Sequence, residues 1–337
     1  MQEKVFICYN NLEVRFMKKK KLKLRKRAYV IFFVLIIMVV GSIYGYQKYK
    51  QYLYEQTYEY KLLTKGYSMD ETKYLESNLD SDKLNQMLER EKDSNIILFM
   101  KEKYFLYKHL DEYLDYYEKN DDTSLQDVVA LINTHANNRW YSLELDTDIS
   151  LNEVMNVNKF YKLSKDYKPD NLVNIPLSYA YGSLGDNKML DYAYDKFMEL
   201  WNAAHEHGYY LMVTSSYRDY KDQEEIYEAR KKSLGERKAD EVAARPGHSE
   251  HQTGLVIDMT SSKEPFADDF TNSEAYKWLK ENAYRYGFIE RYPEGKTYIT
   301  GYSPESWHWR YVGVEAATVI HNEGITFDEY YAYYVEK

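Results

Sequence analysis

Cysteine is almost absent from this sequence of 337 residues, because Cys8 is the only one. A lone cysteine forms no disulfide within the chain, and the chain after it offers no thiol nucleophile. No serine is followed three residues later by a lysine, so the S-x-x-K arrangement of one class of serine enzymes is missing. The zinc-protease helix motif H-E-x-x-H does not occur either. These absences exclude a disulfide scaffold and three common catalytic arrangements.

Excess positive charge is confined to the start of the chain. Residues 1–27 hold ten Lys and Arg against Glu3 and Glu13, a balance of +8, whereas the whole chain has a formal net charge of −9. The remainder therefore carries a balance of −17. The only basic cluster is short and adjoins a hydrophobic run, which argues against a nucleic-acid partner.

Charged residues are missing from residues 28–47, a run of twenty mostly apolar side chains. As a helix this run is about 30 Å long, which matches the hydrocarbon thickness of a bilayer. A cleaved signal peptide is the alternative, but no A-x-A-like site follows Val40. Eight basic residues between Lys18 and Arg27 place the N-terminus in the cytoplasm. We therefore expect a cytoplasmic basic tail over residues 1–27, then an uncleaved single-pass transmembrane helix in the lipid bilayer, with the rest of the chain extracellular.

Glycine and proline are nearly missing from residues 48–150, where Gly66 is the only glycine and no proline occurs. Apolar residues recur there at every third or fourth position, which is typical of short amphipathic helices. We therefore expect an α-helical stalk over this segment. The pieces 61–88 and 107–132 suggest a degenerate helical-hairpin repeat as an alternative, but their likeness is too weak to support it.

The remaining residues, 151–337, alternate between helical and strand-like patterns. A helical stripe covers residues 190–204, and residues 209–216 are strand-like. Asp219 stands where it would cap the next helix, and another helix is expected over residues 273–286. Helices that flank a small, mostly antiparallel sheet define an α+β domain, and we expect this fold class here.

Two short segments supply the residue types of a catalytic zinc site. The first runs from Ser249 to Asp258 and contains His251, and the second contains Glu305 and His308. Two imidazoles and one carboxylate hold zinc and leave a fourth position for water. A second carboxylate is then available as general base.

The spacing of both segments predicts strands. Residues 255–259 alternate so that Asp258 points away from the packed side chains. In residues 307–311, both tryptophans and Tyr311 are expected on one face and His308 on the other. His308 would then meet the first strand in a sheet.

These segments resemble the M15 metallopeptidases of the VanY D-alanyl-D-alanine carboxypeptidase type, whose motif is S-x-H-x-x-G-x-x-x-D followed by E-x-W-H. The family's arginine at a strand end and its downstream glutamine also have counterparts, in Arg218 and Gln223. The resemblance covers roughly the last 185 residues and extends to L,D-carboxypeptidase relatives. Ser306 stands where the family often has proline, and Val256 where it often has a smaller residue. Both positions flank ligands, so the departures concern substrate fit more than metal binding.

The resemblance implies a role for each matched residue. The implied zinc ligands are His251, Asp258 and His308. Glu305 would be the general base, while Gln223 and Ser249 would contact the substrate. Arg218 would both bind substrate and assist catalysis, since a guanidinium suits either a terminal carboxylate or a developing oxyanion.

The implied function is that of a membrane-anchored zinc D-alanyl-D-alanine carboxypeptidase that trims peptidoglycan stem peptides. L,D-carboxypeptidase action on tetrapeptide stems and peptidoglycan endopeptidase action are alternatives, because the stereochemistry of the pocket is not visible in sequence. An alternative of another class is a non-catalytic sensor of wall peptides, but retention of all three ligands and the base argues against it. The stalk is expected to be a spacer, and a docking surface for a wall-synthesis protein is the alternative.

Overall fold

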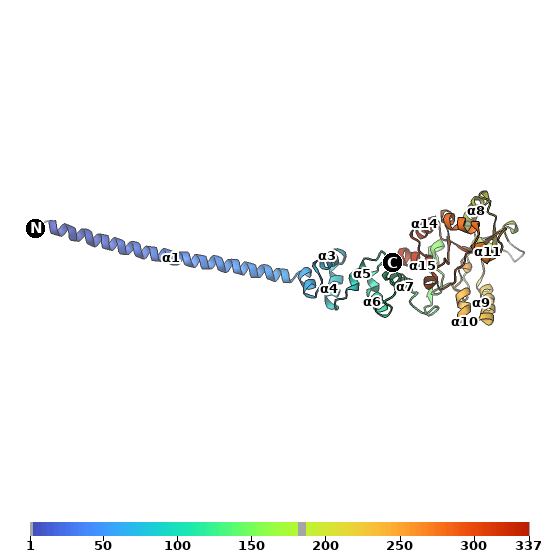
Figure 1. The fold of residues 1–337 in the computed structure, drawn as a ribbon, viewed down its shortest axis with the longest axis horizontal. Coiled ribbons are helices and arrows are strands. Elements are labelled where there is room, and N and C mark those ends of the chain that lie inside the picture. Colours follow the sequence, from blue (N-terminus) through green and yellow to red (C-terminus); the bar gives the residue numbers. More distant parts are fainter. Residues whose placement is uncertain (1–2, 181–186, 337) are drawn as a thin grey trace. The chain divides into compact units, whose positions relative to one another are not determined.

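The structure, a computed structural model, describes residues 3–180 and 187–336 (Figure 1). Contacts between residues divide the chain into two compact units, Met1–Ile97 and Leu98–Lys337. The division falls within the short helix α5 (Asn95–Met100).

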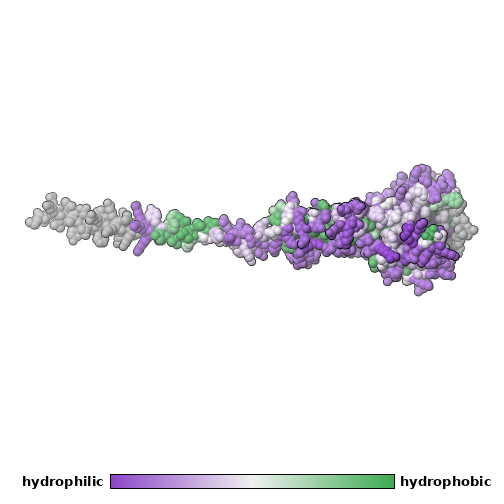
Figure 2. All heavy atoms as spheres, turned by 60° about the horizontal axis from the view of Figure 1, so that its bottom comes forward, coloured by the Kyte–Doolittle hydropathy of each residue, from purple (hydrophilic) through white to green (hydrophobic). Residues whose placement is uncertain are grey.

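The first unit begins with the long helix α1 (Glu3–Glu55). Among the described residues, its part Arg25–Glu55 is the one helix that is long and apolar enough to cross a membrane. The large apolar side chains of this part are exposed, and Figure 2 shows them as a hydrophobic band. An uninterrupted apolar surface differs from the single apolar stripe of a helix on a globular protein. This helix is therefore compatible with a single-pass membrane anchor.

Three short helices follow in the first unit. They are α2 (Tyr58–Thr64), α3 (Met69–Asn78) and α4 (Ser81–Glu89). Each begins at a side chain that accepts a hydrogen bond from a backbone N–H of the first turn, and these caps are Thr57, Ser68 and Asp80. Their buried apolar side chains include Leu62, Leu75, Leu84 and Met87. The helical character expected for residues 48–150 is confirmed in this part of the segment.

The second unit begins with further helices that pack within it. They are α6 (Leu110–Lys119) and α7 (Leu125–Asn133). Leu131 of α7 shares a buried cluster with Ile299.

Two tyrosines, Tyr141 and Tyr302, surround the buried Lys159. The hydroxyl of Tyr141 lies 3.3 Å from that of Tyr302. Nζ of Lys159 lies 5.0 Å from the ring centroid of Tyr141 and 3.8 Å from that of Tyr302, and burial lowers the pKa of Lys159 to about 7.

A four-stranded antiparallel sheet forms the centre of the second unit. Its strand order is β5 (Leu211–Ser215), β6 (Val256–Ser261), β8 (His308–Tyr311) and β7 (Phe288–Glu290). Two smaller sheets accompany it: β1 (Leu145–Asp146) with β2 (Tyr161–Lys162), and β3 (Leu172–Asn174) with β4 (Lys188–Leu190). Only the β1–β2 pair is parallel among the named strands. The predicted α+β class with a mostly antiparallel sheet is confirmed.

One face of the central sheet packs against two helices, α8 (Asp191–Glu206) and α12 (Glu274–Asn282). Phe197 and Leu279 from these helices share one core with Ile257 of β6. Since side chains alternate along a strand, the neighbours of Ile257 point to the opposite face. Asp258 and its register partner His308 therefore lie on that opposite face.

Local sequence signals mark the helix ends. Asp219 accepts a hydrogen bond from the N–H of Asp222 and begins α9 (Tyr220–Leu234), as predicted. Helix α12 continues as the 3-10 helix η5 (Ala283–Tyr286) and ends at Gly287, whose φ is +84°. A Cβ on Gly287 would lie 2.7 Å from the ring of Tyr311, so both conformation and space require glycine there.

The predicted face of Trp307 is wrong. The alternation places it on the core side with Trp309 and Tyr311, but only those two residues join the core. Strand β8 begins at His308, whose N–H donates to the carbonyl of Glu305 in the preceding turn. The alternation therefore does not extend back to Trp307, which instead lines a cavity together with Asp258 and His308.

Short helical segments complete the second unit. The 3-10 helices are η1 (Tyr107–His109), η2 (Ile149–Val154), η3 (Leu177–Tyr179) and η4 (Glu250–Thr253). The α-helices are α10 (Glu236–Val242), α11 (Ala267–Thr271), α13 (Thr297–Thr300), α14 (Val314–Glu323) and α15 (Phe327–Tyr330). A π-helix, η6 (Tyr331–Val335), follows α15. Helices α14 and α15 contribute to a second buried cluster that includes Phe327.

Candidate metal centre and active site

Three elements bring the predicted metal ligands together: η4 with His251, β6 with Asp258 and β8 with His308. Asp258 and His308 are direct partners in the antiparallel register, so their side chains emerge on the same face. Gly254 ends η4 with φ +71° and turns the chain into β6. A Cβ on Gly254 would lie 2.9 Å from the side chain of Leu172, so the turn requires glycine.

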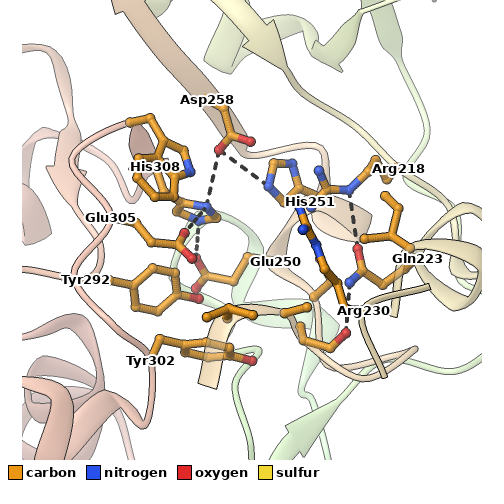
Figure 3. A pocket seen from close by; sticks show the side chains of 16 residues that line it. Arg218, Gln223, Arg230, Glu250, His251, Asp258, Tyr292, Tyr302, Glu305 and His308 are labelled. Carbon is orange, nitrogen blue, oxygen red and sulfur yellow. Dashed lines mark hydrogen bonds and ion pairs between the residues drawn. The ribbon is translucent and has the colours of Figure 1, made fainter. Parts of the chain in front are cut away.

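The ligand atoms converge on one carboxylate oxygen, as Figure 3 shows. Asp258 Oδ1 lies 3.5 Å from His251 Nε2 and 3.3 Å from His308 Nδ1. All three ligand atoms lie within 4.8 Å of one another. Two donors on a tetrahedral zinc ion are separated by about 3.4 Å, which follows from ligand distances near 2.1 Å. Asp258 Oδ1 is also buried without a hydrogen bond of good geometry. The donor set therefore fits Zn²⁺.

Hydrogen bonds behind the ligands fix which imidazole nitrogens face the centre. His251 Nδ1 lies 2.6 Å from the carbonyl of Ser216, so it donates there and leaves Nε2 for a metal. His308 Nε2 lies 3.4 Å from Glu250 Oε2, which leaves Nδ1 for a metal. Such partners orient imidazole ligands and raise their basicity.

Glu250 belongs to a buried network of charges. Its Oε1 accepts hydrogen bonds from Arg291 Nε at 2.8 Å and from Arg310 Nη1 at 3.1 Å, and all three side chains are fully buried. Arg291 also donates two hydrogen bonds to Asp328. Although burial alone would raise it, the two guanidinium groups hold the pKa of Glu250 well below its usual range. Glu250 therefore remains an anion that accepts hydrogen bonds from two arginines. Because its pKa is so low, it is unsuited to be a general base.

The side chains of the centre shift one another's pKa values. Burial and the neighbouring Arg218 lower the pKa of His251 to about 3, so this imidazole is neutral. Burial also opposes a charge on His308, but the carboxylates of Asp258 and Glu250 beside its two ring nitrogens raise its pKa to about 9. The pKa of Asp258 is about 2, because His251 and His308 outweigh the effect of burial. The carboxylates of Asp258 and Glu250 thus stabilise a positive charge on His308, next to the position that a divalent metal would occupy.

Glu305 lies at the edge of this centre, in the turn before β8. Its Oε2 is 3.6 Å from His308 Nδ1, and it does not belong to the group of three ligand atoms. Burial is the main cause that raises the pKa of Glu305 to about 7. A carboxyl group with such a pKa both accepts and releases a proton near neutral pH.

The predicted substrate residues line the same cavity, whose volume is about 210 Å³. Arg218 follows β5 and donates from Nη1 to Ser215 Oγ at 2.9 Å and from Nε to Gln223 Oε1 at 3.2 Å. Gln223, on α9, donates in turn to the carbonyl of Ala244 at 2.8 Å. Ser249 is buried in the cavity wall just before η4. The structure therefore brings all seven predicted site residues together.

Several residues of the site are not predicted from the sequence. The unpredicted lining residues include Ile226, Arg230, Val242, Tyr292, Tyr302 and Trp307. Glu250 is recognisable only as a charged neighbour of His251, and nothing in the sequence marks Arg291 or Arg310 as its buried partners. The ring of Tyr292 lies against that of His308 in a tilted arrangement, with ring centroids 4.9 Å apart, and no sequence signal indicates this contact.

Comparison with known proteins places these residues in a family context. The sequence model of the VanY family, described as D-alanyl-D-alanine carboxypeptidase, matches residues 186–314. YodJ of Bacillus subtilis is 40% identical over 178 residues, which cover 52% of this chain and 65% of YodJ, slightly less than two thirds of its length. VanXYC of Enterococcus gallinarum, a bifunctional D-Ala-D-Ala dipeptidase and D-Ala-D-Ala carboxypeptidase, is 33% identical over 190 residues, which cover 54% of this chain and 95% of that protein.

A solved structure shows the same fold. The LdcB LD-carboxypeptidase, whose structure reveals the molecular basis of its peptidoglycan recognition, aligns with a TM-score of 0.50 and 40% sequence identity. The alignment covers 52% of this chain and 84% of that one. All seven predicted site residues fall between residues 186 and 314, the stretch that matches the family.

The buried network predicts a large stability effect for Glu250→Gln. Glutamine keeps the shape but leaves Arg291 and Arg310 without their shared anion, and breaking a buried ion pair costs about 3–5 kcal/mol. The free energy of unfolding of the metal-free chain should fall by this amount. Denaturant titration followed by tryptophan fluorescence measures it, because all five tryptophans lie in the second unit.

The matched control is Glu241→Gln, which breaks the exposed pair with Arg237. An exposed pair contributes little, so this variant should unfold close to the parent. An equal free energy of unfolding for Glu250→Gln and Glu241→Gln would contradict the predicted stabilisation by the buried network.

Proposed function

Because the chain belongs to the VanY family of D-alanyl-D-alanine carboxypeptidases, we propose that it is a membrane-anchored zinc enzyme that removes the terminal D-alanine from peptidoglycan stem peptides. The observation that carries this proposal is the convergence of Asp258 with His251 and His308 beside a buried Glu305. This arrangement contains every group that a metal-dependent peptide hydrolysis needs.

Each residue has a distinct task in the proposed reaction. Zinc held by His251, Asp258 and His308 would supply a Lewis acid that polarises the scissile carbonyl and acidifies water. Glu305 takes a proton from the attacking water and then gives it to the departing amine. Its pKa of about 7 suits both transfers.

Arg218 and its neighbours bind and orient the peptide. The guanidinium of Arg218 is held by Ser215 and Gln223, so it enters the cavity in a fixed orientation. From there it stabilises either the terminal carboxylate or the oxyanion that develops in the transition state. Ser249, buried in the wall, is proposed to contact the substrate as well.

A defined pair of peptides tests the proposed specificity. A stem pentapeptide that ends in D-Ala-D-Ala should lose one D-alanine, whereas the tetrapeptide product should resist further cleavage. Mass spectrometry of the products distinguishes this result from the others. Cleavage of the tetrapeptide alone would assign L,D-carboxypeptidase action, which the similarity to LdcB favours as the second candidate. Internal cleavage would indicate an endopeptidase, and binding without any product would indicate a sensor.

Substitution of Glu305 separates chemistry from metal binding. Glu305→Gln preserves the size of the side chain but accepts no proton, so kcat should fall about 100-fold or more while one zinc per chain remains. His251→Ala and His308→Ala should instead lose zinc, because each removes a ligand. Metal content by mass spectrometry and turnover of the pentapeptide are the two measurements.

Glu274→Gln, an exposed change at the start of α12, is the control and should keep both zinc and activity. A zinc-free Glu305→Gln variant, or one as active as the parent, would show that the base is another group.

The chain organisation is proposed from the same reasoning. Residues 1–27 form a cytoplasmic tail, residues 28–47 the transmembrane helix, residues 48–150 the helical stalk and residues 151–337 the peptidase domain. The apolar surface of α1 supports the anchor. The stalk is proposed as a spacer, with docking of a wall-synthesis protein as the alternative role.

Protease treatment of intact, wall-stripped cells tests this orientation. The basic cluster before residue 28 should keep the N-terminus inside, so external protease should digest everything from about residue 48 onward. A cytoplasmic marker protein must survive in the same sample, which shows that the cells are sealed. Resistance of the second unit in sealed cells, followed by digestion after permeabilisation, would reverse the proposed orientation.

A further inference from the structure

The catalytic cavity opens to solvent between two helices. Among its lining residues, the exposed ones are Ile226 and Arg230 of α9 and Val242 at the end of α10. Ile226 is 37% exposed and Val242 is 45% exposed, although both are large apolar side chains. Figure 3 includes Arg230 among the side chains around the cavity. The mouth of the cavity is thus lined by two exposed apolar side chains, Ile226 and Val242, and by the guanidinium group of Arg230.

Arg230 makes no ion pair or hydrogen bond within the described part of the chain. Its own helix explains this, because the positions three and four residues away hold no acid: they are Ile226, Tyr227, Ser233 and Leu234. Other exposed cations nearby are paired at helical spacing, such as Lys221 with Glu225 and Arg237 with Glu241. The guanidinium of Arg230 is therefore available to a ligand.

The cavity holds two arginines at different depths. Arg218 is mostly buried beside Asp258 and Glu305, at the reacting end. Arg230 lies seven residues after Gln223 on the same face of α9, about 10 Å further along the helix axis. An extended peptide covers this distance with about three residues. A peptide whose scissile bond lies at the inner end would thus bring an upstream residue close to Arg230.

We propose that Arg230, with Ile226 and Val242, forms a subsite for a carboxylate on the N-terminal side of the scissile bond. The apolar side chains pack against the peptide, and the guanidinium binds an acidic group on a residue about three positions upstream. This inference rests on the proposed function, because it assumes that a peptide reacts at the inner end. The subsite selects acidic peptides over their amidated forms.

Binding of the product tetrapeptide to the zinc-loaded, full-length chain tests the subsite without any turnover. Calorimetry would compare three forms of this peptide, which differ at the second residue, about three positions upstream of the scissile bond, or at the C-terminus. The second residue carries a free carboxylate in the first form and a carboxamide in the second. The third form has the free carboxylate but an amidated C-terminus. The acid should bind about three- to tenfold more tightly than the carboxamide, and this ratio should decrease with salt because the pair is exposed. Arg230→Gln should bring the ratio to one, and Arg230→Lys should restore part of it.

Arg237→Gln is the matched control. It removes the same charge from an exposed side chain that does not line the cavity, so the ratio should remain as in the parent. Equal binding of acid and carboxamide by the parent would overturn the proposal, as would undetectable binding or an equal effect of Arg237→Gln. If Arg230→Gln instead abolished the effect of C-terminal amidation, Arg230 would bind the peptide's own terminus, which also overturns it.

Cleavage of the pentapeptide, measured separately, distinguishes failure of the subsite from failure of the proposed function. Tight, acid-selective binding without release of D-alanine would support the subsite and contradict the proposed carboxypeptidase activity. Release of D-alanine with equal kcat/KM from acid and carboxamide peptides would support the activity and contradict the subsite.

Discussion

The register that pairs Asp258 with His308 determines the geometry of the whole active site. Because these residues are direct partners on adjacent antiparallel strands, their side chains meet on the face that is not covered by α8 and α12. The turn at Gly254 brings His251 to the same carboxylate oxygen. A slip of one residue would move either ligand to the packed face, so the apolar core that fixes the register also fixes the metal centre.

Charge compensation imposes a second constraint on the molecule. Burying Glu250 behind His308 costs desolvation energy, which Arg291 and Arg310 offset through hydrogen bonds to the same oxygen. Asp328, from the C-terminal helix α15, balances one of these arginines. The orientation of a metal ligand is thereby coupled to the packing of the last helices of the chain.

The sequence predicts those features that depend on neighbouring residues or on a dense motif. Asp219 caps its helix because the cap involves only the adjacent turn. The proximity of the three predicted metal ligands follows from the sequence because their types and spacings occur together in one motif. Trp307 is misplaced because a turn interrupts the alternation one residue before the strand begins. The pairing of Arg291 with Glu250 is not predicted, because it joins residues 41 positions apart and an isolated arginine is normally expected at the surface.

The aromatic contacts of Lys159 bear on where the folded catalytic part of the chain starts. Tyr141 reaches the cavity wall through the hydroxyl of Tyr302, and both rings lie close to the buried ammonium group of Lys159. Tyr141 precedes the stretch that matches the family, at residues 186–314. A fragment cut at residue 151 would therefore retain every predicted site residue but lose one side of the aromatic enclosure around a buried amine. The stretch that matches the family model contains every residue that lines the cavity, but not Tyr141, which supports one of them from outside.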